Sequence, residues 1–218
     1  VGNKGYMSWD QIIELEKENF AHIGNHSHSH DYLTKFTFQK FVEDIEKSIK
    51  IFNNKLGYNP IFFSYPFGEY NLEQKNYISN NFEFAFGQHS GVIDLNKDRY
   101  ELPRFPINEK YGEIKRFKEV ISYLPLQYKI IKPENKFMND GENPPKMTIE
   151  FFEDQKNLEN INCFSNEGSK WRKTKIILND NILNINFSEK FIERRGRINC
   201  SLKDENGWRF SGFQFVQN

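Results

Sequence analysis

Residues 38–68 read FQKFVEDIEKSIKIFNNKLGYNPIFFSYPFG. Apolar residues recur every three or four positions from Phe38 to Leu56, which predicts an amphipathic helix that ends at Gly57. The mostly apolar run at 60–66 predicts a buried strand that ends at its second proline. A helix followed directly by a buried strand is typical of α/β folds.

Similar elements flank this stretch on both sides. A capping-box pattern at Ser8 and Gln11 starts a helix. The other expected elements, in chain order, are a strand at 20–24, a helix at 72–80, a strand at 82–86, a strand at 104–107 and a helix at 114–121. Strands that alternate with helices at this spacing predict repeated βα units in a parallel sheet or barrel.

The last third of the chain has a different pattern. A stretch rich in Pro, Asn and Gly predicts a linker or long loop at 129–146. Beyond it, period-two patterns predict strands at 147–151, 175–178, 182–187, 197–200 and 209–215. We therefore expect three parts: an α/β domain at 1–128, the linker, and a small antiparallel β-sandwich domain at 147–218.

The composition excludes several classes of protein. Lys plus Arg and Asp plus Glu both number 30, so no net charge draws the chain to nucleic acid. No apolar run approaches the roughly 20 residues of a membrane span. The two cysteines, Cys163 and Cys200, exclude a disulfide-dense scaffold and a cysteine-ligated zinc site. They form either one bridge or two buried thiols, and the sequence leaves both open.

Three of the five histidines stand at alternate positions: His26, His28 and His30. On a helical turn, the spacing of four between His26 and His30 places two imidazoles on one face, where they can hold a metal ion. A third ligand, usually a carboxylate, would complete a catalytic site with an open position for water. The alternative is a polar, solvated loop, and His28 is expected to point away from the metal.

Three segments together carry a resemblance to a known family. They are 24–30 with the histidines, 63–68 with Tyr65-Pro66-Phe67-Gly68, and 102–106 with Leu102-Pro103-Arg104. In this order and spacing they resemble the polysaccharide deacetylases, that is, the NodB-homology domain of carbohydrate esterase family 4. The resemblance covers about residues 7–125.

The resemblance implies a fold, a reaction and roles for particular residues. The fold would be a distorted (β/α) barrel of NodB type, and the reaction the metal-dependent hydrolysis of N-acetyl groups on an N-acetylglucosamine-type polysaccharide. His26 and His30 would hold a divalent metal, most often zinc, and the backbone N–H of Phe67 would be the oxyanion donor. Tyr65 and Pro66 would contact substrate. Arg104 would pair with a site carboxylate or, alternatively, lie on the barrel rim.

The chain departs from the family pattern in one respect. The family's Asp-Asp pair, which supplies the metal carboxylate and the general base, does not occur in this sequence. We expect the pair and the first barrel strands in a preceding segment of the polypeptide. The alternatives are an inactive carbohydrate-binding homologue and an O-acetyl esterase. Residues 1–5 have no signal-peptide features, but a polysaccharide substrate implies a periplasmic, cell-surface or secreted enzyme.

Two tryptophans of the predicted β domain are candidates for glycan binding. Trp171 and Trp208 lie in the predicted β domain and could stack on sugar rings, although we expect core packing. His89, which follows a predicted strand, is expected to be structural or to lie behind the site.

Overall fold

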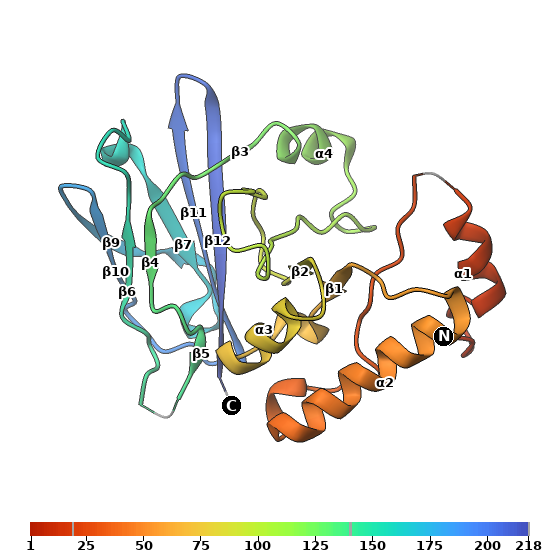
Figure 1. The fold of residues 1–218 in the computed structure, drawn as a ribbon. Coiled ribbons are helices and arrows are strands. Elements are labelled where there is room, and N and C mark those ends of the chain that lie inside the picture. Colours follow the sequence, from red (N-terminus) through yellow and green to blue (C-terminus); the bar gives the residue numbers. More distant parts are fainter. Residues whose placement is uncertain (19, 140, 218) are drawn as a thin grey trace. The chain divides into compact units, whose positions relative to one another are not determined.

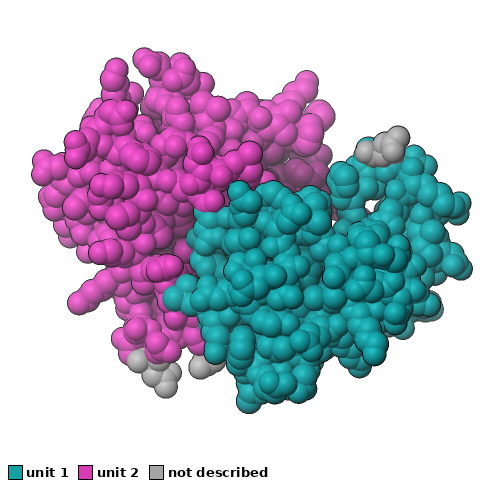
Figure 2. Space-filling view, viewed as in Figure 1, with its two compact units in different colours: residues 1–87, 98–101 teal, residues 88–97, 102–218 magenta. Residues whose placement is uncertain are grey.

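The computed structural model describes residues 1–18, 20–139 and 141–217, and the fold is mixed α/β (Figure 1). Its contacts divide the chain into two compact units (Figure 2). Unit 1 is Val1–Gly87 with Asp98–Glu101, and unit 2 is Gln88–Lys97 with Leu102–Asn218.

The described residues of unit 1 contain three α-helices, each close to its predicted position. They are α1 (Trp9–Glu16), α2 (Phe38–Leu56) and α3 (Leu72–Ser79). The capping box predicted for the start of α1 is confirmed, since the Ser8 side chain and the Gln11 side chain each bond the other's backbone. Helix α2 ends at Gly57, whose φ of 82° is left-handed, so the predicted stop is also confirmed.

The sheet of unit 1 is parallel. Strand β1 (Phe62–Ser64) pairs with β2 (Phe84–Phe86), as Figure 1 shows. On its other edge β1 bonds only Asn25, which donates to the Phe62 carbonyl and accepts from the Ser64 N–H. The strand predicted at 20–24 is therefore wrong, because the pairing begins after it and extends over one residue. The deacetylase-type barrel stays a prediction.

The core of unit 1 lies between α2, α3 and the sheet. Its buried members are Leu33, Phe41, Ile45, Phe63, Tyr65, Ile78, Phe82 and Ala85. Phe41 and Ile45 come from the apolar stripe of α2 that the sequence periodicity predicted.

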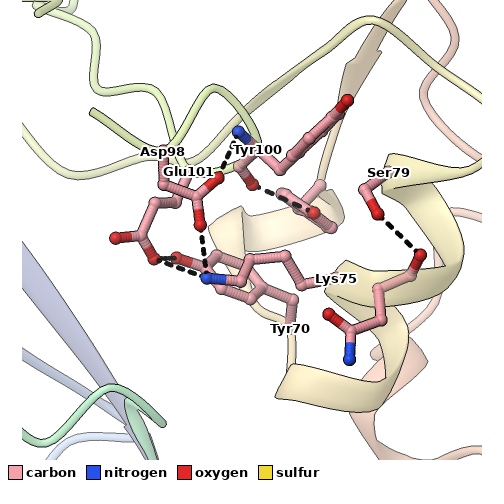
Figure 3. A network of polar contacts seen from close by, with 8 residues as sticks. Tyr70, Lys75, Ser79, Asp98, Tyr100 and Glu101 are labelled. Atoms are coloured by element: carbon pink, nitrogen blue, oxygen red, sulfur yellow. Dashed lines mark hydrogen bonds and ion pairs between the residues drawn. The ribbon is translucent and has the colours of Figure 1, made fainter. Parts of the chain in front are cut away.

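A polar network joins the segment 98–101 to α3 (Figure 3). Lys75 forms ion pairs with Asp98 at 2.6 Å and Glu101 at 3.5 Å, and the Tyr70 hydroxyl donates to Glu101 at 2.9 Å. Burial, followed by the charge of Glu101, raises the pKa of Tyr70 well above its usual value. Burial lowers the pKa of Lys75, but the carboxylates of Glu101 and Asp98 outweigh it, so the Lys75 pKa is raised.

These shifts predict a loss of stability at alkaline pH. A raised pKa in the folded state means that the unfolded chain releases the proton first as the pH rises, so the stabilisation is complete below the unfolded pKa and is lost above it. We expect the free energy of unfolding to fall above about pH 10. Urea unfolding between pH 8 and 11 measures this. Tyr70→Phe should reduce the alkaline slope, and an unchanged slope in that variant would contradict the role of Tyr70.

Unit 2 is built mainly from strands. Helix α4 (Ile114–Val120), which was predicted at 114–121, precedes all of these strands. The strands are β3 (Leu124–Pro125), β4 (Ile130–Lys132), β5 (Phe137–Met138), β6 (Met147–Glu150), β7 (Asn162–Ser165), β8 (Arg172–Lys173), β9 (Lys175–Asn179), β10 (Ile182–Asn186), β11 (Arg195–Asp204) and β12 (Gly207–Gln217). The five strands predicted for this region are confirmed as β6, β9, β10, β11 and β12.

These strands form two sheets. One has the order β4-β6-β10-β9, and the other has β3-β12-β11-β7-β8 with β5 also paired to β12. Buried side chains from both sheets belong to one hydrophobic cluster, for example Ile149 and Leu183 from the first and Ile198 and Phe215 from the second. The β-sandwich stays a prediction in its details.

A disulfide crosses the second sheet. Cys163 on β7 and Cys200 on β11 are paired in register and bonded to each other, and both are fully buried. Of the two states that the sequence left open, the structure has the bridge.

Two regions differ from the sequence predictions. The predicted linker 129–146 contains β4 and β5, whose pairing with β6 and β12 its irregular composition did not reveal. The strand predicted at 104–107 is wrong. Its one proline, Pro106, has no N–H to donate, and the Arg104 N–H donates to the His89 carbonyl. The domain boundaries 1–128, 129–146 and 147–218 stay a prediction.

Within the described ranges, no helix is both long enough and apolar enough to span a bilayer.

Candidate functional site

The histidine loop begins where the chain leaves the edge of β1. Asn25 bonds the β1 backbone on both sides, and its buried side chain exchanges hydrogen bonds with Ser48 of α2 at 2.9 and 3.1 Å. The same amide oxygen accepts the Ser27 N–H at 2.9 Å. Asn25 therefore fixes the start of the loop to the sheet and to the helix.

A buried carboxylate holds the middle of the loop. Asp44 of α2, 8% exposed, accepts the backbone N–H groups of His28 at 2.9 Å and Ser29 at 3.0 Å, one on each carboxylate oxygen. The sequence analysis missed Asp44. Its signal was an acidic residue next to Ile45 and three positions after Phe41, on the face of α2 that packs into the core.

The two predicted metal ligands lie next to each other. The rings of His26 and His30 have centroids 4.8 Å apart at an interplanar angle of 68°. The sequence argument assumed a helical turn here, and that assumption is wrong. Positive φ angles at Ser27 (68°) and His30 (57°) turn the backbone instead.

A backbone carbonyl sets the protonation of one ring. His26 Nδ1 lies 2.6 Å from the Ser64 carbonyl oxygen at the end of β1. A carbonyl can only accept, so Nδ1 carries the proton, and in the neutral ring the lone pair is on Nε2. This is the arrangement in which histidine binds metals, with the second nitrogen oriented by a backbone acceptor.

The Tyr65–Gly68 segment lies against the histidine loop. Phe67 has a φ of 59°, unusual for a bulky residue, and its ring packs at 5.0 Å from His30 and stacks on Tyr32 at 4.2 Å. Ser27, His30 and Phe67 are three of the six non-glycine residues with positive φ in the described part of the chain. Strained backbone of this kind concentrates at functional sites.

The family comparison covers the part of the chain that contains these residues. Residues 1–84 match the model of the family described as polysaccharide deacetylase. This stretch, which is less than half of the chain, is thus similar to the polysaccharide deacetylase family. The deacetylase match ends at Phe84 and therefore includes the histidine loop, α2 and the Tyr65–Gly68 segment.

Solved deacetylase structures have a similar fold. The Streptococcus pyogenes deacetylase PplD in complex with acetate aligns with a TM-score of 0.51 at 17% identity, over 55% of this chain and 52% of that one. BC0361, a polysaccharide deacetylase from Bacillus cereus, aligns with a TM-score of 0.50 at 20% identity, over 56% of this chain and 38% of that one. The alignments thus span about half or less of those proteins. No match was found among curated protein sequences.

The donor set of unit 1 fits part of a metal site. Two imidazoles in contact, one with a fixed tautomer, suit two ligand positions of a zinc-type ion. Among the residues that the structure describes, no group of three His, Cys, Asp or Glu side chains is arranged to hold a metal. Among these residues, no carboxylate therefore completes a three-ligand site with His26 and His30.

The remaining predicted site residues have other surroundings. Tyr65 is 1% exposed and donates its hydroxyl to the Tyr100 carbonyl, and Pro66 is buried beside it. Burial, followed by the charge of Asp98, raises the Tyr65 pKa well above its usual value. These contacts are structural, and substrate contact by Tyr65 and Pro66 stays a prediction. Arg104 belongs to unit 2, and its pairing with a carboxylate stays a prediction.

Asp44 can be tested as a residue that positions the loop. Replacing it with alanine leaves two loop N–H groups without their charged acceptor, so Asp44→Ala should lower the free energy of unfolding by about 2–3 kcal/mol. Asp44→Asn keeps one acceptor oxygen and should lose less. Urea unfolding measures both, and Glu43→Ala, an exposed neighbour on α2, is the control. Equal stability of Asp44→Ala and the control would contradict the assignment.

Proposed function

We propose that the protein is a metal-dependent hydrolase that removes N-acetyl groups from an N-acetylglucosamine-type polysaccharide. The match of residues 1–84 to the polysaccharide deacetylase model supports the reaction class. The observation that carries the proposal is the contact between His26 and His30, with the His26 tautomer set by Ser64. The reaction consumes water, breaks the amide C–N bond, and releases acetate and a free amine on the sugar.

His26 and His30 would hold the metal, most often zinc in this family. A bound divalent ion would lower the pKa of a water molecule and polarise the amide carbonyl. The Ser64 carbonyl keeps the proton on His26 Nδ1, so that Nε2 of the neutral ring can donate its lone pair to the metal. Asp44 and Asn25 hold the loop backbone and thereby fix the distance between the two rings.

The Tyr65–Gly68 segment would supply the oxyanion donor. The backbone N–H of Phe67 is proposed to stabilise the negative charge that develops on the carbonyl oxygen. The positive φ of Phe67, supported by its ring contacts with Tyr32 and His30, sets the direction of the peptide groups at this turn. The third ligand and the general base are proposed to be the family's Asp-Asp pair, supplied by a further segment of the polypeptide. Action on a polysaccharide implies a periplasmic, cell-surface or secreted location.

Acetate release tests the proposal. The full-length protein, with the segment proposed to carry the Asp-Asp pair, is treated with a chelator, then reloaded with zinc, and incubated with N-acetylglucosamine oligomers or with an O-acetylated glycan. We expect acetate and new free amines from the N-acetyl substrate, lost on chelation and restored by zinc. Acetate from the O-acetylated glycan alone would replace the proposal with esterase activity. Oligomer binding without acetate release, with zinc present, would indicate an inactive carbohydrate-binding homologue.

A further inference from the structure

Unit 2 contains a cavity of about 370 Å³ that the deacetylase chemistry does not use. We call it the arginine pocket. The residues that define it here are Arg104, Arg116, Arg197, Tyr111, Trp171 and Asn199. None of the residues that line it is acidic, and its volume lies within the range of small-ligand sites.

Strand β11 forms one wall of the arginine pocket. Arg197 and Asn199 alternate with the buried residues Ile198 and Cys200, so they lie on the opposite face of the strand from the core. Arg197 Nε donates to Gln214 of β12 at 3.2 Å, which fixes the plane of its guanidinium group. Arg197 is thus positioned before any ligand binds.

The loop at 88–91 is locked against the same strands. Gly91 bridges Ser211 of β12. A side-chain carbon at Gly212 would overlap the Ser90 carbonyl oxygen and would lie 2.5 Å from the Asn199 side chain, so only glycine permits this approach. The wall formed by Gln88, His89 and Ser90 is therefore held in place by tight packing.

Among the described residues, the hydrogen bonds of a second arginine go to neutral acceptors. Arg116 Nη1 donates to the carbonyl oxygens of Pro106 and Tyr111, both at 2.9 Å, and its guanidinium lies 5.1 Å from the Tyr111 ring centre. Carbonyls and an aromatic face orient the cation without cancelling its charge. Its positive charge remains available to an anion.

The charges around Arg197 repel one another. Burial, followed by the positive charge of Arg195, lowers the pKa of Arg197; Arg104 lowers it further, and the carboxylate of Glu193 opposes them. The cations Arg195 and Arg104 and the carboxylate of Glu193 thus all act on the charge of Arg197. A bound oxyanion would relieve this repulsion and would accept paired hydrogen bonds from a guanidinium group.

Beside these arginines lies an exposed aromatic ring. Trp171, just before β8, is 54% exposed, so the expectation that it packs in the core is wrong. Trp208, at 47%, is likewise exposed. An exposed indole offers a flat apolar face on which the C–H side of a sugar ring can pack.

We propose that the arginine pocket binds a sugar that carries an anionic group, a carboxylate or a phosphate, with the anion on Arg197 and Arg116 and the ring against Trp171. The binding of an anionic sugar rests on the pocket alone. Its assignment to the polysaccharide substrate, which would then contain acidic sugars, rests on the proposed function.

Calorimetric titration of the whole chain tests the proposal without any measurement of acetate release. The probes are glucuronic acid, glucose 6-phosphate, inorganic phosphate and neutral glucose. We expect both anionic sugars to bind more tightly than glucose and than phosphate, and the stronger of the two identifies the anion. Equal binding of glucose and of the anionic sugars would overturn the proposal. Binding of inorganic phosphate as tight as that of both sugars would also overturn it, because the ring would contribute nothing.

Matched variants locate the binding. Arg197→Gln should weaken binding of the tighter anionic sugar about tenfold, the expected value of one charged hydrogen bond. Lys203→Gln removes the same charge from an exposed position on the same strand and should change it less than about twofold. Equal effects of the two variants would show general charge attraction and overturn the assignment.

A second pair of variants guards against misfolding of Arg197→Gln. Trp171→Ala, at an exposed position, should weaken binding of the anionic sugars but not of inorganic phosphate. Trp208→Ala removes an equally large exposed ring beside Lys203 and should leave both unchanged. Binding that survives Trp171→Ala in full would contradict the stacking of the ring. Failure of acetate release with intact anionic-sugar binding would overturn only the proposed function.

Discussion

The His26→Ala variant is expected to lose zinc affinity by about a hundredfold or more. Replacing groups that merely orient a ligand lowers metal affinity by about 10–100-fold, and His26 is itself a proposed ligand. Its Nδ1 contact with the Ser64 carbonyl and the neighbouring His30 ring give the physical reason, since the one remaining imidazole holds zinc weakly. Equilibrium zinc titration and metal analysis after gel filtration measure the loss.

His28→Ala is the matched control. His28 lies in the same exposed loop, and its recorded bond to Asp44 comes from the backbone N–H, which alanine keeps. We expect zinc affinity within about twofold of the parent protein, because no ligand is removed. If His26→Ala retained the zinc content of the parent, or if His28→Ala lost as much, the assignment of His26 and His30 as the ligand pair would be wrong.

Opening the disulfide is expected to be the largest single loss of stability. Cys163 and Cys200 are 37 positions apart, and closing a loop of this length restricts the unfolded chain by about 4 kcal/mol at room temperature. The bridge also joins the paired strands β7 and β11 inside the core of unit 2. Urea unfolding of the oxidised and the reduced chain, with thiol titration to verify each state, measures the difference.

Reduction is a cleaner test than mutation, because it leaves both sulfur atoms in the core. The Cys163→Ala/Cys200→Ala double variant should lose at least as much, since it also removes buried volume. Oxidised and reduced chains that unfold at the same urea concentration would contradict the expectation.

Elements with strong local signals were predictable from the sequence. Helices α1 and α2 carry their own start or stop signals, at Ser8 and Gly57, and an apolar stripe long enough to define α2. The two strands of the β9–β10 hairpin were predicted from their period-two patterns, and Asp180 in the turn between them adopts a φ of 52°. These features depend on residues that are close in sequence, so they can be predicted from a single sequence.

Elements defined by distant partners were not predictable. Strands β3, β5 and β8 are two residues long, too short for any period, and exist only because β12 or β7 runs beside them. The bridge between Cys163 and Cys200 depends on their opposite positions in the ladder of β7 and β11, which spacing alone does not reveal.

The candidate site shows the same division. His26, His30 and Phe67 were found by motif, and the structure brings their side chains into one row of ring contacts. Asp44 was missed because its role is a bond across 15 and 16 positions to backbone groups, which no residue pattern encodes. The predicted metal roles stay predictions.

The anchoring of the histidine loop to α2 separates accessibility from mobility. His26 and His30 are exposed to solvent, yet the backbone between them is hydrogen-bonded to Asp44 of the 19-residue helix α2. Phe41 and Ile45, on the same helix, belong to the core. Movement of this loop would require its hydrogen bonds to Asp44 to break or α2 to leave the core. A substrate would therefore meet a surface already set in its working shape, with no ordering left to be done on arrival.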